Sequence, residues 1–284
     1  MLELTSLPDI RAWTSAERAA GRRVALVPTM GYLHEGHLAL VDEGRKRADS
    51  IVLSIFVNPL QFGPREDLAR YPRDLPRDRA LASRRGVDTI FVPRASDMYP
   101  TGSEIRVVPG PMAERWEGAA RPGHFTGVLT VVAKLFHLTQ PDVACFGQKD
   151  IQQLALIRRM VRDLNWPLEI VMVRTVRESD GLAMSSRNAY LAGPDRSRAA
   201  VLSRALRAAH DGWRSGETEA HALEARMRDI LREEPDVTVE YIAVVDPEAL
   251  APVRTADGET IVALAARIGS TRLIDNIVLA QGID

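Results

Sequence analysis

Short apolar runs alternate with helical stretches over the first two-thirds of this chain, and this alternation restricts its fold more than any other feature. The clearest run, at 50–57, reads Ser-Ile-Val-Leu-Ser-Ile-Phe-Val. Strands rich in valine and isoleucine that are separated by helices are typical of parallel βαβ units. The sequence therefore predicts an α/β fold whose N-terminal domain is a Rossmann-like, doubly wound parallel sheet. Strands are expected at 24–27, 50–57, 89–92, 143–146 and 168–173, and helices at 35–48, 73–85, 128–138 and 151–164.

The pattern changes after about residue 180. Gly269 and Ser270 separate two apolar runs and indicate a hairpin of antiparallel strands. A smaller α+β C-terminal domain is therefore expected, and we divide the chain into residues 1–187 and 188–284, with the boundary between 174 and 194. Its helices are expected at 195–213 and 219–233, and its strands at 237–245, 260–268 and 271–279.

Composition excludes several classes of protein. The 37 basic and 38 acidic residues leave a net charge of −1, so no positive field favours nucleic acid. The N-terminus lacks the pattern of a secretory signal, and no apolar run is long enough to cross a membrane. The single cysteine, Cys145, cannot form an internal disulfide and is expected to be a buried core thiol. A cytoplasmic protein with no nucleic-acid or membrane partner is expected.

Two histidines three residues apart follow the first predicted strand. His34 and His37 share one face of a helical first turn, and Gly31 and Gly36 allow close backbone approach. Helix N-terminal amides favour anions, so this segment predicts a phosphate site. Zinc binding is less well supported, because the metalloprotease pattern needs histidines four residues apart. Two ordinary surface histidines on a capped helix remain an alternative.

Neutral polar side chains follow the second predicted strand. Asn58 and Gln61 suit hydrogen bonds to a small hydroxylated or zwitterionic ligand, although a turn built on Asn-Pro explains them equally well. Tyr71 lies in the same connection and has the same two interpretations. Arg121, just before a predicted helix, could bind a carboxylate or phosphate, but one arginine is a weak signal.

Charged and hydroxyl groups follow the last two strands of the predicted parallel sheet. Lysine is scarce, with three among 37 basic residues, so Lys149 after Gly147 is a candidate phosphate ligand. Asp150 could cap the next helix, and Gln153 would point back toward the strand ends. The loop Ser185-Ser186-Arg187 suits closure on polyphosphate or is a polar linker. Four of these five polar segments follow predicted strands, where open α/β sheets bind ligands.

These blocks resemble the pantothenate synthetases (pantoate–β-alanine ligases) along essentially the whole chain. The resemblance rests on six ordered blocks. They are Pro28-Thr29-Met30-Gly31 with His34-Glu35-Gly36-His37, Phe56-Val57-Asn58-Pro59 with Gln61-Phe62, Tyr71-Pro72-Arg73, Arg121 with His124-Phe125, Phe146-Gly147 with Lys149-Asp150 and Gln152-Gln153, and Asp180 to Asn188. The wider superfamily is that of nucleotidylyl transferases and class I aminoacyl-tRNA synthetases, whose two signatures resemble 34–37 and 184–187.

The resemblance implies a reaction and its participants. Members condense pantoate with β-alanine using ATP and Mg²⁺, through a pantoyl adenylate, and release AMP and pyrophosphate. The family is typically homodimeric, and the C-terminal domain would act as a lid that keeps water from the adenylate. No protein ligand of magnesium is assigned, and Asp78 is suggested only as a ligand through water.

The resemblance also assigns residues to roles. The catalytic residues would be His34, His37, Lys149 and Arg187, with His37 as a candidate proton donor to the phosphates. The ATP-binding residues would be Met30, Gly31, His34, His37, Gly147, Lys149, Asp150, Val176, Met184, Ser185, Ser186 and Arg187. Pantoate and β-alanine would contact Gln61, Gln153, Asn58, Tyr71 and Arg121.

Two other functions remain as alternatives. A nucleotidylyl transferase that joins a phosphate ester to a nucleotide would use both histidines equally. Asn58, Gln61 and Gln153 disfavour it, because they suit a polyol or carboxylate rather than a second phosphate. An RNA-binding relative of the synthetases is disfavoured by the net charge of −1 and by the absence of a basic aromatic stripe.

Overall fold

A six-stranded parallel sheet forms the centre of the N-terminal part. The computed structural model describes residues 1–64 and 66–283. The strand order is β1-β4-β3-β2-β5-β6, and every neighbouring pair is parallel. The predicted α/β fold with a parallel sheet is therefore confirmed. The strands are β1 (Leu2–Leu4), β2 (Val24–Thr29), β3 (Ser50–Ile55), β4 (Thr89–Phe91), β5 (Val143–Gly147) and β6 (Glu169–Val173).

Helices cover both faces of this sheet, because its central strands are apolar on both sides. In β2, Val24 and Leu26 pack into one core cluster with helices α1, α6 and α7, whereas Ala25 and Val27 pack into another with α2. The helices are α1 (Leu7–Ala19), α2 (Glu35–Arg45), α3 (Leu75–Arg84), α4 (Ala95–Met98), α5 (Glu117–Ala120), α6 (His124–Thr139) and α7 (Ile151–Asp163). Short 3₁₀ turns include η1 (Pro59–Gln61), η2 (Pro111–Glu114), η3 (Gln148–Asp150) and η4 (Ser186–Tyr190).

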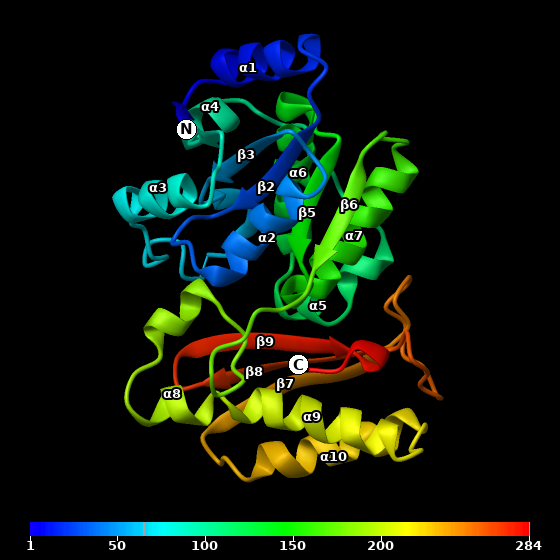
Figure 1. Ribbon diagram of the computed structural model, residues 1–284. Helices are drawn as coiled ribbons and strands as arrows, with labels where there is room; N and C mark the ends of the chain where they lie inside the picture. The colour runs from blue at the N-terminus through cyan, green and yellow to red at the C-terminus, as the bar shows by residue number, and fades with distance from the viewer. Residues whose placement is uncertain (65, 284) are drawn as a thin grey trace.

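The order of strands places a switch point beside β2. The chain runs from β2 to β3 on one side, whereas β5 pairs with the other side of β2. Connections leave in opposite directions there, which opens a crevice beyond the carboxyl ends of the strands. Figure 1 shows β5 and β6 pointing toward the C-terminal part of the molecule. Any ligand in that crevice would therefore lie between the two parts.

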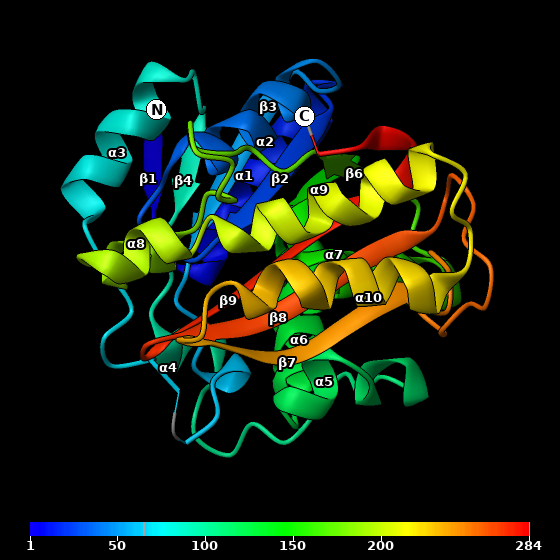
Figure 2. The same ribbon diagram turned by 90° about the horizontal axis from the view of Figure 1, so that it is seen from below.

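The C-terminal part is an antiparallel sheet with two long helices on one face. The sheet order is β7-β8-β9, and helices α9 and α10 lie side by side across it, away from the parallel sheet (Figures 1 and 2). Residues 174–193 connect the two sheets, and the division at 187/188 remains a prediction. The elements are α8 (Pro194–Arg198), α9 (Val201–Arg214), α10 (Ala220–Arg232), β7 (Val237–Val245), β8 (Ile261–Ile268), β9 (Thr271–Val278) and η5 (Leu279–Gln281).

Some elements differ from the sequence-based expectation. The helix expected at 195–213 is two helices, α8 and α9, with a break at Ala199 and Ala200. Helix α1 was not predicted, because two of its three buried residues, Thr14 and Glu17, are polar and hide the apolar stripe. Strand β1 has only three residues, too few for a periodic pattern. Within the described residues, no helix combines the length and apolar character needed to span a bilayer.

Candidate active site

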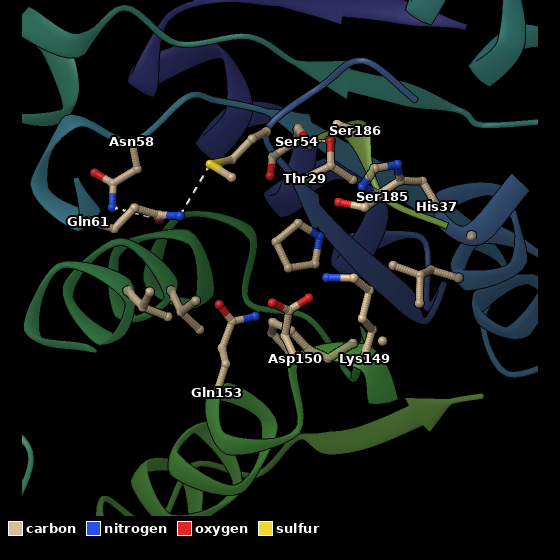
Figure 3. Close-up of a pocket in the computed structure, with 18 of the residues that line it drawn as sticks. Thr29, His37, Ser54, Asn58, Gln61, Lys149, Asp150, Gln153, Ser185 and Ser186 are labelled. Atoms are coloured by element: carbon tan, nitrogen blue, oxygen red, sulfur yellow. Dashed lines mark hydrogen bonds between the residues drawn. The ribbon is translucent and has the colours of Figure 1, made fainter. Parts of the chain in front are cut away.

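A cavity of about 210 Å³ lies beyond the carboxyl ends of β2, β3 and β5. Every site residue predicted from the sequence lines it except Gly31. Figure 3 shows Lys149, Asp150 and Gln153 on one side of the space, facing His37, Ser185 and Ser186 across it, with Gln61 and Asn58 at one end. Segments that are more than 100 residues apart in the sequence thus meet at the switch point of the sheet.

The turn after β2 is fixed by a buried carboxylate. Asp78, 1% exposed, accepts hydrogen bonds from the backbone N–H groups of Tyr32 (2.8 Å) and Leu33 (2.7 Å). Gly31 has φ +83°, and a Cβ there would lie 2.9 Å from Ile55 and 3.0 Å from Asp78. Both oxygens of Asp78 are therefore used to shape the turn. The suggestion that this side chain holds magnesium through water stays a prediction, and its absence from the lining of the cavity gives it no support.

The two histidines stack at the start of α2. Their ring centroids are 4.0 Å apart, and the backbone N–H of His34 lies 3.3 Å from Nδ1 of His37. With Nδ1 as acceptor, the proton of a neutral His37 ring is on Nε2. Nδ1 of His34 is buried and has no hydrogen-bond partner within the described residues. Gly36 is required beside this pair, because a Cβ there would lie 2.9 Å from the His34 ring.

Burial keeps both imidazoles uncharged at neutral pH. Burial, followed by the charges of Lys149 and Arg77, lowers the pKa of His34 to about 4. Burial, followed by His34 and Lys149, holds the pKa of His37 well below its ordinary value of 6.5. A neutral imidazole can still donate one N–H hydrogen bond, so the pair can bind an anion without carrying charge.

Lys149 is presented by a short turn that the C-terminal sheet holds. Turn η3 follows β5 directly, and Nδ2 of Asn276 on β9 donates to the carbonyls of Gln148 (3.0 Å) and Lys149 (2.8 Å). Its ammonium group therefore projects into the cavity from a backbone that both parts of the molecule fix. In Figure 3 the Lys149 side chain points toward the centre of the cavity, beside Asp150.

The amide of Asn58 is used within the protein and orients Gln61. Its Nδ2 donates to Oε1 of Gln61 (3.1 Å) and to the carbonyl of Gly127 (3.1 Å), and its Oδ1 accepts from the hydroxyl of Tyr99 (2.8 Å). Nε2 of Gln61 lies 3.2 Å from Sδ of Met30. Asn58 is 1% exposed and lines the cavity, so its bonds orient Gln61, while its predicted contact with substrate stays a prediction.

Two arginines at the cavity are paired with carboxylates that follow each other in the sequence, Glu66 and Asp67. Arg121 contacts Glu66 through two hydrogen bonds of 2.9 and 2.7 Å. Arg187 contacts Asp67 through two of 2.9 Å, and its guanidinium lies over the ring of Tyr71. The sequence predicted that both arginines face ligand anions. The structure places them at the cavity with internal carboxylates as partners, and these partners come from a loop more than 50 residues away.

Several lining residues were missed in the sequence. One wall is apolar and comes from Val128, Val131, Val132 and Leu135 of α6. Their i, i+3, i+4, i+7 spacing marks one helix face, which could have identified them. His124, Ser54 and Thr175 also line the cavity. His124 belongs to a block that carries the family resemblance but was given no role, and Ser54 and Thr175 gave no signal of their own.

The cavity lacks a cage for a metal ion. Asp150 is the only carboxylate among the described residues that line it. No group of three His, Cys, Asp or Glu side chains suited to a metal occurs in the described part of the chain. Such a site fits Mg²⁺ only where most of its ligands are water and phosphate oxygens, which is the usual coordination of this ion.

Comparison with known proteins agrees with this geometry. A model of the pantoate-beta-alanine ligase family matches residues 3–278. Pantothenate synthetase from Geotalea uraniireducens (strain Rf4) is 52% identical over 278 residues, which cover 98% of this chain and 99% of that protein. The crystal structure of pantothenate synthetase from Thermus thermophilus superposes with a TM-score of 0.94 at 50% identity, covering 98% of this chain and 99% of that one.

A more distant relative gives the same result. The pantoate-beta-alanine ligase of Francisella tularensis, whose crystal structure is complexed with β-γ ATP and β-alanine, is 30% identical, with a TM-score of 0.81. The superposition covers 100% of both chains. A family model and relatives that match over nearly the full length leave no part of the catalytic fold unaccounted for. The chain belongs to the pantoate–β-alanine ligase family.

Proposed function

We propose that this chain catalyses the ATP-dependent condensation of (R)-pantoate with β-alanine, giving pantothenate, AMP and pyrophosphate. The observation that carries the proposal is the cavity at the switch point. It brings two neutral histidines and Lys149 together with the amides of Gln61 and Gln153. This combination suits a phosphate chain beside a hydroxyl-bearing carboxylate.

The reaction proceeds in two steps. A carboxylate oxygen of pantoate attacks the α-phosphorus of ATP, the bond from that phosphorus to the bridging oxygen breaks, and pyrophosphate leaves. The amine of β-alanine then attacks the carbonyl of pantoyl adenylate, AMP leaves, and the new amide nitrogen loses a proton. The protein contributes positioning and charge stabilisation, because no covalent enzyme intermediate is needed.

The residues that would bind the phosphates supply hydrogen bonds and one positive charge, the ammonium group of Lys149. His34 and His37 donate N–H groups to phosphate oxygens, and the unpartnered ring nitrogen of His34 supports such a ligand. Lys149 neutralises charge that develops at the α-phosphate. Ser185, Ser186 and Arg187 hold the departing pyrophosphate. Backbone and side-chain groups of Met30, Gly31, Gly147, Asp150, Val176 and Met184 complete the ATP site.

The part of the cavity that would bind pantoate is lined by uncharged amide groups and by apolar side chains. Gln61 and Gln153 would bind the hydroxyls and carboxylate of pantoate, and the valines of α6 face its geminal methyl groups. Asn58 holds Gln61, while Tyr71 and Arg121 border the space for β-alanine or pyrophosphate. Gln61 and Gln153 offer amide groups rather than a cation to a second phosphate, which disfavours the nucleotidylyl transferase alternative.

Mg²⁺ would be carried on the phosphates. Asp150 is the side chain available to it, directly or through water, and the ion would supply charge neutralisation on ATP oxygens. The C-terminal residues 188–284 would act as the lid that excludes water from the adenylate.

A homodimer in the cytoplasm is the proposed working form. Two large apolar side chains, Ile105 (87% exposed) and Val108 (74% exposed), lie on a segment without helix or strand. Exposed apolar residues gathered on one segment are typical of a contact surface. The single cysteine, Cys145, is buried and its pKa is raised by burial to about 12, which suits an inert thiol in a reducing compartment.

Isotope exchange tests the first step directly. Labelled pyrophosphate should enter ATP when pantoate is present and β-alanine is absent, because adenylate formation is reversible and needs no amine. Exchange that needs no pantoate, or none with any acid, would contradict the proposal. Replacing pantoate with a phosphate ester gives the matched test of the nucleotidylyl transferase alternative.

A further inference from the structure

A buried carboxylate joins the two parts of the molecule beside the cavity. Glu117 is the first residue of α5 and is 6% exposed. Its Oε1 lies 2.7 Å from a guanidinium nitrogen of Arg272 and 3.3 Å from one of Arg121. Arg272 belongs to β9 in the C-terminal sheet, whereas Arg121 precedes α6 in the N-terminal part. One carboxylate therefore lies between two cations from different sheets.

The C-terminal side of this contact is fixed by several bonds. Arg272 also pairs with Glu240 on β7 at 2.7 Å. Next to Glu117, Nε1 of Trp116 donates to the carbonyl of Leu250 at 3.0 Å. Trp116 has φ +49°, a left-handed conformation that is unfavourable for an aromatic residue and that needs strong local contacts. Residues 116 and 117, at the start of α5, are thus attached to the C-terminal part through the loop between β7 and β8 and through β9.

In the N-terminal part, the Glu117–Arg121 contact continues to the backbone of Gln61. Arg121 donates to the backbone carbonyl of Gln61 at 3.2 Å, and Nδ1 of His124 lies 2.8 Å from the same oxygen. A carbonyl cannot donate, so Nδ1 of His124 carries the proton and Nε2 accepts from Arg121 at 3.1 Å. The backbone of Gln61 is therefore held by Arg121 and His124. Arg121 is in turn held by Glu66 within the N-terminal part and by Glu117, which also reaches the C-terminal sheet.

Removing the negative charge of Glu117 would disturb both Arg121 and Arg272. With Glu117 ionised, the two guanidinium groups share a counter-ion. Burial opposes that ionisation, but Arg272 and Arg121 outweigh it and lower the pKa of the Glu117 carboxyl. With a neutral group in its place, Arg121 keeps Glu66 and Arg272 keeps Glu240, but the carboxylate that lies between the two guanidinium groups is lost. Arg121 is then no longer joined to the C-terminal sheet, and its bond to the carbonyl of Gln61 is loosened.

We propose that Glu117 is a positioning residue that makes the pantoate side of the cavity depend on the C-terminal sheet, by joining Arg272 to Arg121 and so to Gln61. The inference rests on the proposed function in one respect, namely that Gln61 binds pantoate. It assigns no contact between Glu117 and the histidines that serve the phosphates. Loss of the carboxylate should therefore affect pantoate far more than ATP.

The kinetic test compares two conservative variants. Glu117→Gln should raise the KM for pantoate about tenfold, the usual size for loss of a charge-assisted contact, and leave the KM for ATP within about twofold. Glu240→Gln is the matched control, because it removes the other carboxylate from Arg272 but leaves the bridge from Arg272 through Glu117 to Arg121 in place. It should leave both KM values unchanged. Glu117→Asp, which restores the charge on a shorter side chain, should recover part of the loss.

A double-mutant cycle tests the link to the C-terminal sheet. Arg272→Gln should also raise the KM for pantoate, and its effect should not add to that of Glu117→Gln, because both changes break one connection. Arg272→Gln also keeps the proposal testable if Glu117→Gln does not fold. An unchanged pantoate KM in Arg272→Gln, or KM values that rise equally for all substrates, would overturn the proposal.

A second readout does not need activity. Hydrogen exchange of the backbone amides at 58 and 60–62 should become faster in Glu117→Gln than in Glu240→Gln, because only the first variant releases the Gln61 backbone. Equal exchange in both variants would overturn the positioning role. If the wild-type protein does not use pantoate, the proposed function fails, whereas this exchange comparison still decides what Glu117 does.

Discussion

Lys149 and His37 face each other across one cavity, and each offers a donor where negative charge develops. The loss of a single such donor typically reduces a rate by about 10²–10³. We therefore expect Lys149→Ala and His37→Ala each to reduce adenylate formation at least about tenfold while leaving the fold intact. Pyrophosphate exchange measures the first effect, and circular dichroism measures the second. Wild-type exchange in a folded variant would remove that residue from the mechanism.

The buried histidines also predict how stability depends on pH. Burial, with Lys149 for His34 and Arg121 for His124, lowers the pKa of each ring to about 4. In the unfolded chain the ordinary pKa is about 6.5, so unfolding takes up protons between these values. The free energy of unfolding should therefore fall as the pH falls from 6.5 toward 4, and should not change above that window.

Urea denaturation at pH 7.5 and at pH 5.5 measures this change in the free energy of unfolding. Both pH values lie above the ordinary pKa values of carboxylates, so the titration of Asp and Glu side chains contributes little to the difference. Each of the two rings should contribute about 1 kcal/mol to the loss. Equal midpoints and slopes at the two pH values would mean that these rings are not held neutral by the fold.

Single residues also show what the sequence could and could not reveal. His34, His37 and Lys149 were identified because they follow strands and belong to motifs that are local in sequence. The partners of Arg121 and Arg187 were not, because Glu66 and Asp67 come from a distant loop. The bridging role of Glu117 depends on β9, 155 residues away, and no local pattern encodes such a contact.

At the scale of elements, Gly127 allows α6 to lie directly against η1. A Cβ at this position would lie 2.1 Å from the carbonyl oxygen of Leu60, which is backbone and cannot move away like a side chain. Gly127→Ala should therefore push η1 and Gln61 out of place. We expect a loss of about 1–3 kcal/mol in stability, despite the helix propensity of alanine, and a raised KM for pantoate.

Thermal denaturation and pantoate titration check this expectation. Gly110→Ala is the control, because no heavy atom lies within 4 Å of a Cβ there. A Gly127→Ala protein as stable and as active as the Gly110→Ala protein would show that the α6–η1 contact does not position Gln61.

The accuracy of the predicted elements depended on how strongly each one is patterned. The central strands are buried on both faces, so their valine and isoleucine runs were found within two residues of the observed ends. Helix α1 buries polar residues and was missed. The break between α8 and α9 lies in Ala199-Ala200, a pair that favours helix and keeps right-handed helical backbone angles, so no local pattern indicates it.

At the scale of the whole molecule, the exposed segment around Ile105 carries the proposed dimer contact. Replacing Ile105 and Val108 with aspartate should convert a dimer to a monomer, because charges would be buried without partners. Light scattering measures the mass. Leu164→Asp, which changes an exposed leucine elsewhere, is the control and should remain dimeric. A dimer that survives the double substitution would show that its contact lies on another surface.

The central claim is that both substrates react in the one cavity between the two sheets. The most direct measurement is AMP release from ATP and Mg²⁺ with pantoate and β-alanine, omitting each component in turn. We predict AMP only when both substrates are present, in an amount equal to the pantothenate formed. AMP release that ignores β-alanine would retain adenylation but assign a different acceptor. No turnover by the folded protein would contradict the assigned function and leave the family resemblance as one of fold alone.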